Sequence, residues 1–320
     1  MTIFSGYTEK QIKQAAQVLT DGHLVAFPTE TVYGLGADAT NEKAVNWLYK
    51  VKGRPADHPL IVHLHSINGL ADWASYVREY AIELARAFWP GPMTLILPRT
   101  NLAKDFITAS QNNVGIRVPS HPLALKLLSE SENMGVKGIA APSANRFGAV
   151  SPTTAEAVRE ELGSYLSGSD LVLDGDNSYV GIESTIIDCT GSNPRIIRPG
   201  AITKDMIRAT INVNLLGDTY TAVKAPGTYQ SHYAPKAKVV IDGTVRPGYG
   251  LIALDTVSTP LEVTRLAAPT NAEQFARNLY QAFRTADALG LDHVSVILPT
   301  GEGLETAIRD RVEKAAARTE

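Results

Sequence analysis

Short apolar segments alternate with amphipathic helical patterns through the first 210 residues, and this alternation limits the fold more than any other feature. A capping pattern at Thr8 and Gln11 begins an amphipathic helix that ends near Gly22. Apolar strands are predicted at Leu24 to Phe27 and at Leu60 to Leu64, with a helix between them. Strands and helices that alternate in this way predict an α/β domain.

The alternation breaks between Gly217 and Lys238, where the chain has neither a helical nor a strand period and is bracketed by prolines. Beyond the break, further strands surround a long helix predicted at Asn271 to Leu289. We therefore expect a first domain over residues 1–212, a linker over 213–237 and a small α/β domain over 238–320.

Composition excludes several classes of protein. The chain has 320 residues, of which 44% are apolar and 20% charged, as in an ordinary globular protein of about two domains. Its apolar runs are too short for a transmembrane span of roughly 20 residues, and no secretory signal is recognisable, so we expect a cytoplasmic protein. The single cysteine, Cys189, excludes an intramolecular disulfide and a cysteine-built zinc site.

The charge balance bears on nucleic acid as a partner. Residues 1–210 hold 19 Lys and Arg against 21 Asp and Glu, and residues 238–320 hold 9 against 11. A domain that binds nucleic acid through its phosphates normally carries a surplus of cations. The balance disfavours a non-catalytic RNA-binding module, although a local basic groove would be compatible with it.

Two motifs suggest functions that their surroundings do not support. The stretch Gly34 to Ala39 matches a loose dinucleotide-binding fingerprint, but six residues separate it from Phe27, whereas the fingerprint needs a tight turn directly after the strand. His63 and His65 share one face of a strand, but no third metal ligand is identifiable nearby, so zinc is not expected.

Polar residues gather in four segments that end predicted strands or helices, where α/β sheets form ligand crevices. In the first, Pro28 to Gly36, the threonines either satisfy turn amides or present hydroxyls to a polar ligand. In the second, Gly53 ends a helix, so Lys52 and Arg54 stand on an ordered turn suited to a polyphosphate. Lys50 needs no ligand, because a cation suits the last turn of a helix.

The other two segments follow apolar strands. Arg117 interrupts the strand Val114 to Val118 and either faces outward or binds a carboxylate with both arms of its guanidinium. After Ala140 and Ala141, small residues would let a ligand approach Ser143 closely, while Ser151 either joins that site or caps the next helix.

In this order, the segments resemble the YrdC-like family in its long, two-domain form. Lys52-x-Arg54 followed by Ser143-x-Asn145 is similar to the family's K-x-R…S-x-N signature. Further matching blocks are Pro28-Thr-Glu-Thr-Val-Tyr-Gly-Leu35, Trp89-Pro-Gly-Pro-Met-Thr94, Arg117-Val-Pro119, Glu183-Ser-Thr-Ile186 and Ile197-Arg-Pro-Gly200. The resemblance implies an α/β fold with a YrdC-like twisted open mixed sheet and helices, followed by a smaller Rossmann-like α/β domain.

The resemblance also implies an enzyme, a nucleotidyltransferase that makes L-threonylcarbamoyl-adenylate and pyrophosphate from ATP, L-threonine and bicarbonate. Downstream tRNA-modification proteins would use the product, and a weak contact with tRNA itself is compatible with the family. Magnesium is expected through the ATP phosphates, with no organic cofactor and no membrane. A carbamoyl-adenylate-forming relative, the HypF-type enzyme, is an alternative, but its cysteine-rich zinc fingers are excluded by the single cysteine.

Site residues follow from the resemblance by position. Those expected around ATP are Lys52, Arg54, His58, Asn113, Ser143, Asn145, Ser151, Arg198, His232 and Tyr233. Those expected around threonine are Thr31, His63, Arg117, Ala141 through its backbone, and Ser184. Lys52 and Arg54 are the expected catalytic residues, because their charge would stabilise the transferring phosphate. The linker either covers the site as a lid, through Tyr229, His232 and Tyr233, or is a plain spacer.

Overall fold

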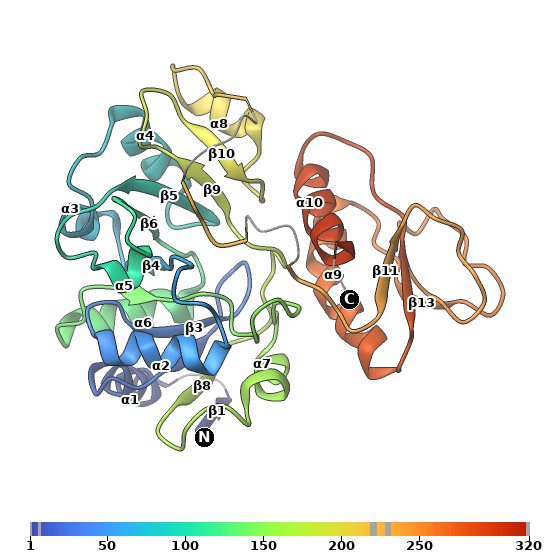
Figure 1. Ribbon diagram of the computed structural model, residues 1–320, viewed down its shortest axis with the longest axis horizontal. Helices are drawn as coiled ribbons and strands as arrows, with labels where there is room; N and C mark the ends of the chain where they lie inside the picture. Colours follow the sequence, from blue (N-terminus) through green and yellow to red (C-terminus); the bar gives the residue numbers. More distant parts are fainter. Residues whose placement is uncertain (1, 6–7, 218–222, 228–231, 318–320) are drawn as a thin grey trace.

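The computed structural model describes residues 2–5, 8–217, 223–227 and 232–317. It contains a large domain and a smaller C-terminal domain, each built from a sheet and helices (Figure 1). The predicted α/β class and the mixed sheet of the first domain are confirmed.

The large domain is built on one mixed sheet with the strand order β1-β8-β2-β3-β7-β4-β6-β5-β9-β10. The sheet contains parallel pairs such as β4 with β6 and antiparallel pairs such as β2 with β3. The strands are β1 Thr2–Ser5, β2 Val25–Phe27, β3 Gly34–Asp38, β4 Ile61–His63, β5 Met93–Pro98, β6 Asn113–Arg117, β7 Ile139–Ala140, β8 Leu171–Asp174, β9 Thr185–Asp188 and β10 Arg195–Arg198.

Helices cover both faces of this sheet, because alternate residues of its strands are apolar on opposite sides. Val25 and Phe27 belong to the apolar cluster that contains α1 and α6, whereas Leu24 and Ala26 belong to the cluster that contains α2 and α4. The helices are α1 Glu9–Thr20, α2 Glu42–Lys52, the 3-10 turn Ile67–Gly69, α3 Leu70–Trp73, α4 Glu79–Phe88, α5 Asp105–Thr108, α6 Pro122–Asn133, α7 Ala155–Leu162 and α8 Lys204–Thr210.

The C-terminal domain has a fully parallel sheet in the order β11-β14-β12-β13. Its elements are β11 Lys238–Ile241, β12 Gly250–Ile252, β13 Thr264–Ala267, α9 Ala272–Ala288, β14 His293–Val296 and α10 Leu304–Ala316. The apolar faces of α9 and α10 pack on the sheet and extend to Val32, Val150 and Ile182 of the large domain. One apolar core therefore joins the two domains.

The first polar segment differs from the prediction, because Gly34 to Asp38 forms β3 instead of ending a loop. This strand pairs antiparallel with β2, so residues 28–33 are the tip of a hairpin. At Gly36 a Cβ atom would lie 2.8 Å from side-chain atoms of both Ile139 and Phe27. Glycine is needed there for close packing, and its low strand propensity hid the strand from the sequence.

Within the described residues, no helix combines the length and the apolar character that crossing a membrane requires.

Candidate active site

A narrow cavity of about 50 Å³ lies between the large sheet and the described residues 223–227 and 232–237, which we call the strap. The cavity has room for a few water molecules and none for a nucleotide. A larger groove of about 690 Å³ runs between α7 and α9, but it contains none of the predicted site residues. The residues that line the narrow cavity include Thr31, Arg54, His63, Arg117, Ala141, Ser143, Glu183, Ser184, Arg198, Pro226, Gly227, His232 and Tyr233.

All five residues predicted for threonine line this cavity. His63 and Arg117 end the parallel strands β4 and β6, and the register pairs them directly, which brings both side chains to one edge of the sheet. Ala141 follows β7, Ser184 precedes β9, and Thr31 lies in the β2–β3 hairpin. The sheet topology therefore assembles residues from five separate stretches of the chain.

Arg117 is held by a buried carboxylate that the sequence did not single out. Its Nη2 lies 2.7 Å from Oε1 of Glu30, and both side chains are almost fully buried. The other oxygen, Oε2 of Glu30, accepts a hydrogen bond from the backbone N–H of Ser120 at 3.0 Å. Glu30 thus orients the guanidinium at the cavity, as a carboxylate partner does for a bidentate arginine. In the sequence, the one indication of this contact was the position of Glu30 between Thr29 and Thr31.

His63 offers an uncharged hydrogen-bonding position. Burial, together with the nearby Arg117 charge, lowers the pKa of His63 to about 3, so the imidazole is neutral at ordinary pH. Its Nδ1 is buried and has no hydrogen-bond partner among the residues that the structure describes. A buried polar atom without a partner is costly unless a ligand satisfies it.

Arg198 connects the cavity to the strap. Its Nε donates to the carbonyl of Ser184 and its Nη2 to the Ser184 hydroxyl, each at 3.0 Å. Its Nη1 donates to the carbonyl of Pro226 in the strap, also at 3.0 Å. The Pro226 carbonyl therefore accepts a hydrogen bond from an Arg198 N–H that could equally donate to a phosphate oxygen.

Of the residues predicted for ATP, half line the cavity: Arg54, Ser143, Arg198, His232 and Tyr233. Lys52 does not, because its Nζ donates to the carbonyls of Ser143 and Asn145, at 2.5 Å each. Lys52 is 2% exposed, and burial, with the neighbouring Arg54, holds the pKa of its ammonium well below the usual range. In this arrangement Lys52 fixes the loop after β7.

The remaining four predicted ATP residues also point elsewhere. The Asn145 amide donates to the carbonyls of Arg146 and Ala149 within its own loop. His58 packs edge-on against Phe147, with ring centroids 5.0 Å apart. Asn113 lines a small neighbouring cavity, and Ser151 donates to Glu183. For all ten residues, nucleotide binding stays a prediction.

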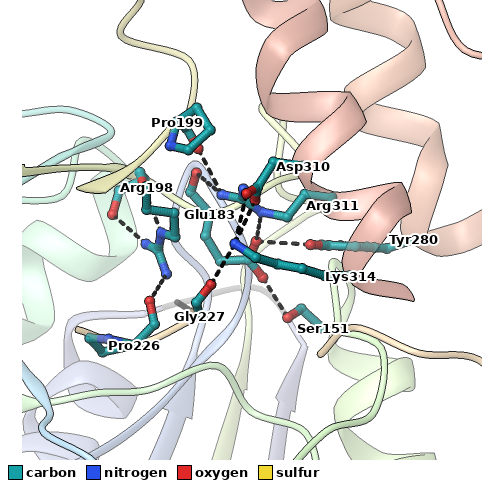
Figure 2. A network of polar contacts seen from close by, with 11 residues as sticks. Ser151, Glu183, Arg198, Pro199, Pro226, Gly227, Tyr280, Asp310, Arg311 and Lys314 are labelled. Carbon is teal, nitrogen blue, oxygen red and sulfur yellow. Dashed lines mark hydrogen bonds and ion pairs between the residues drawn. The ribbon is translucent and has the colours of Figure 1, made fainter. Parts of the chain in front are cut away.

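Glu183 is the centre of a polar network that links the two domains (Figure 2). Its Oε1 accepts from the Ser151 hydroxyl at 2.6 Å, and its Oε2 accepts from Tyr280 and from Nε of Arg311, both at 2.8 Å. Burial alone would raise the pKa of Glu183, but Arg311 and Arg198 outweigh it and hold the pKa at about 2. The carboxylate next to Ser184 is therefore fixed by side chains of α9 and α10.

The strap forms the roof of the cavity. Its residues Pro226, Gly227, His232 and Tyr233 line the cavity, so the described part of the linker does more than join two domains. The ring of Tyr233 stacks on Tyr280 of α9 at 5.8 Å. Tyr229, the third predicted lid residue, lies outside the described residues.

Two family models match the chain. A model described as "Telomere recombination" matches residues 17–200, and a model described as "Threonylcarbamoyl-AMP synthase, C-terminal domain" matches residues 202–317. The first therefore covers most of the large domain, and the second runs from its last helix through the strap to the end of α10.

Relatives match over almost the whole length. A Pyrococcus abyssi protein named threonylcarbamoyl-AMP synthase is 38% identical over 99% of this chain and 98% of its own. A Bacillus subtilis protein of the same name is also 38% identical, over 96% of this chain and 93% of its own. The crystal structure of P. abyssi Sua5 complexed with L-threonine is similar with a TM-score of 0.88 at 36% identity, covering 99% of this chain and 98% of that chain.

Proposed function

This chain belongs to the Sua5 and YrdC family in its two-domain form, and we propose that it is a threonylcarbamoyl-AMP synthase. The reaction joins ATP, L-threonine and bicarbonate into L-threonylcarbamoyl-adenylate and releases pyrophosphate. The observation that carries the proposal is the cavity in which all five predicted threonine residues meet. The similarity of the whole chain to a protein crystallised with L-threonine supports the same assignment.

Threonine would bind with its carboxylate on Arg117. A guanidinium accommodates a carboxylate with two parallel hydrogen bonds, and Glu30 holds the Arg117 side chain in place for them. The neutral imidazole of His63 and the hydroxyls of Thr31 and Ser184 provide uncharged partners for the amine and hydroxyl of the substrate. Uncharged partners around the amine matter, because the amine must be deprotonated to react.

The chemistry then needs no covalent bond to the protein. The threonine amine adds to bicarbonate and water leaves, which gives a carbamate. A carbamate oxygen attacks the α-phosphorus of ATP, and the bond to the β-phosphate oxygen breaks as pyrophosphate departs. Arg54 and Arg198 line the cavity and would stabilise the charge that develops on phosphate oxygens. Lys52 would contribute indirectly, because its ammonium holds the loop that carries Ser143 and Asn145.

Magnesium would enter as part of the substrate, the Mg·ATP complex. Among the residues that the structure describes, no three His, Cys, Asp or Glu side chains form a group that could hold a metal ion. Phosphate oxygens and water are the ligands that magnesium prefers in nucleotide sites, and the bound ion lowers the charge that the arginines must balance.

Entry of L-threonine and of ATP requires the strap to move. The cavity holds only about 50 Å³, and Arg198 donates to the Pro226 carbonyl where a phosphate would bind. Exchange of that carbonyl for a phosphate oxygen would couple nucleotide binding to the position of the strap. Once closed, the strap excludes water, which protects a carbamate that decomposes readily in solution.

The product would pass to tRNA-modification proteins, and we expect the reaction in the cytoplasm. A weak direct contact with tRNA is compatible with this assignment. A purely RNA-binding role gains no support, since relatives that match almost the whole chain carry the name of the enzyme.

The test is an assay of the purified chain with Mg·ATP, L-threonine and labelled bicarbonate. We expect pyrophosphate release that depends on L-threonine, together with label in an adenylate product. D-threonine serves as the matched control and should give background release. Pyrophosphate release that is absent, or equal with and without L-threonine, would contradict the proposed function.

A further inference from the structure

Both described ends of the strap contact one residue of the C-terminal domain, Lys314 of α10. The Nζ of Lys314 donates to the carbonyl of Gly227 at 2.8 Å, and its backbone carbonyl accepts from the N–H of His232 at 3.2 Å. Gly227 and His232 both line the cavity. A single residue therefore clasps the strap at the two points where it enters and leaves the interval 228–231.

The ammonium of Lys314 is held in place for this contact. It lies 2.7 Å and 2.9 Å from the two carboxylate oxygens of Asp310, one helical turn earlier on α10. Figure 2 shows the Lys314 side chain extending from α10 toward Gly227, beside the Arg311 side chain. Its side chain is 14% exposed, so solvent screens the charge only in part.

A second residue of α10, Arg311, lies close to the strap. Arg311 pairs with Glu183, and its guanidinium carbon lies 5.3 Å from the ring centroid of Tyr233. The large domain also contacts the strap: Arg198 donates to the carbonyl of Pro226, Gln111 exchanges two hydrogen bonds with the backbone of Lys224, and the Gly148 carbonyl accepts from the N–H of Ala234. Successive strap carbonyls, those of Pro226 and Gly227, thus accept from cations of different domains. If a phosphate oxygen replaces the Pro226 carbonyl as the acceptor of Arg198, the hydrogen bond from Lys314 to Gly227 remains.

From this arrangement we infer that Lys314 is a positioning residue for the active site, supplied by the C-terminal domain to hold the strap over the reacting groups. The inference rests on the proposed function, because the strap is the roof of that active site. It assigns a task to the C-terminal domain: α10 keeps the roof closed while the carbamate is attacked. Lys314 itself does not line the cavity.

Loss of the clasp should affect turnover more than substrate affinity. Threonine binds to Arg117 and its neighbours, which Lys314 does not contact, so KM for threonine should change little. A looser roof admits water, and the carbamate or the finished adenylate then decomposes within the site. Less labelled adenylate should form per pyrophosphate released.

The variant that tests this is Lys314→Met, which keeps the aliphatic stem and removes the charge and the donor. Lys314→Arg is the conservative variant, because it can still donate to the Gly227 carbonyl. Lys238→Met is the matched control, the same change at an exposed lysine of β11 in the same domain. For each we would measure kcat, KM for threonine, adenylate formed per pyrophosphate, melting temperature, and amide hydrogen exchange of strap peptides.

We expect K314M to lower kcat about tenfold, the value of one charged hydrogen bond, with fewer adenylates per pyrophosphate and faster exchange in the strap. K314R should recover most of the activity, K238M should match the wild type, and all melting temperatures should agree within about 2 °C. Wild-type kcat and strap exchange in K314M would overturn the inference. So would equal losses in K314R and K314M that follow a fall in melting temperature.

The two proposals fail separately. If the wild type releases no threonine-dependent pyrophosphate, the proposed function fails. If the wild type and K238M are active and K314M equals them, only the role of Lys314 fails.

Discussion

The residues predicted for threonine, which we call the threonine end, are held differently from those predicted for ATP, which we call the nucleotide end. At the threonine end, every predicted residue lines the cavity, and strand ends of the large sheet carry or flank most of them. At the nucleotide end, Lys52 donates to backbone carbonyls of the loop after β7, and Asn145 donates to carbonyls of that same loop. Strand register fixes where a side chain points, whereas turns and loops leave that choice to local contacts.

A second difference concerns charge. Glu30 and Glu183 are buried carboxylates beside the threonine end, and each is paired with an arginine. The nucleotide end includes buried cations: Lys52 bonds to two carbonyls, whereas Arg198 bonds to two carbonyls and a hydroxyl and also interacts with the Glu183 charge. Paired charges suit a small zwitterion, and a cation that contacts carbonyls suits a polyphosphate.

The largest effect should come from Arg311→Met, which leaves the Glu183 carboxylate buried without its closest cation. We expect the free energy of unfolding to fall by about 3–5 kcal/mol, as when one partner of a buried ion pair is removed. Urea unfolding would measure it. The double variant E183Q/R311M should regain much of the loss, because no unpaired charge then remains.

The same pair predicts a pH dependence. The pKa of Glu183 is about 2 in the folded chain, below its ordinary value of 4.5, so its stabilising effect is complete above about pH 4.5 and is lost as the pH falls toward 2. The difference in unfolding free energy between wild type and R311M should therefore shrink over that interval. A difference that stays constant from pH 6 to 3 would show that the pair does not stabilise the fold.

Arg117→Met should have the next largest effect and should separate the two ends. Loss of a bidentate contact to the carboxylate, about 2.7 kcal/mol, predicts a fall of about 100-fold in kcat/KM for threonine with little change in KM for ATP. E30Q/R117M is the companion variant, which avoids a lone buried carboxylate. Equal losses for ATP and threonine would mean that Arg117 supports the whole site and not its threonine end.

Lys52→Met should cost less in threonine recognition and more in nucleotide use. It removes the contacts to the carbonyls of Ser143 and Asn145, and we expect the rate to fall at least about tenfold with a higher KM for ATP. Steady-state kinetics with each substrate varied in turn would measure it. Wild-type turnover in K52M would remove Lys52 from the site.

The smallest effect concerns the buried histidines. Burial lowers the pKa of His63 and of His232 to about 3, so both stay neutral from pH 5.5 to 7.5. The dissociation constant of threonine, measured by calorimetry across this range, should show no inflection near pH 6.5. An inflection that disappears in His63→Gln would contradict the neutral imidazole.

Much of the fold was predictable from the sequence, because apolar periodicity is a local signal. It indicated β2, β4 and the long helix α9, but missed β3, where glycines pack closely between neighbours. That the residues of the threonine end meet at one cavity was predictable once the family blocks were recognised, and their binding of threonine stays a prediction. The pairing of Glu183 with Arg311 was not predictable, since the two residues lie 128 positions apart and no local pattern connects them. Nor could the sequence indicate that Lys52 turns toward backbone carbonyls.

The most direct test of the account is a crystal structure of the chain with L-threonine bound. We expect threonine in the cavity beneath the strap, with its carboxylate on the Arg117 guanidinium and a polar atom within hydrogen-bond distance of Nδ1 of His63. Threonine bound elsewhere, or with its carboxylate on Arg54 or Arg198 while Arg117 keeps only Glu30, would contradict it.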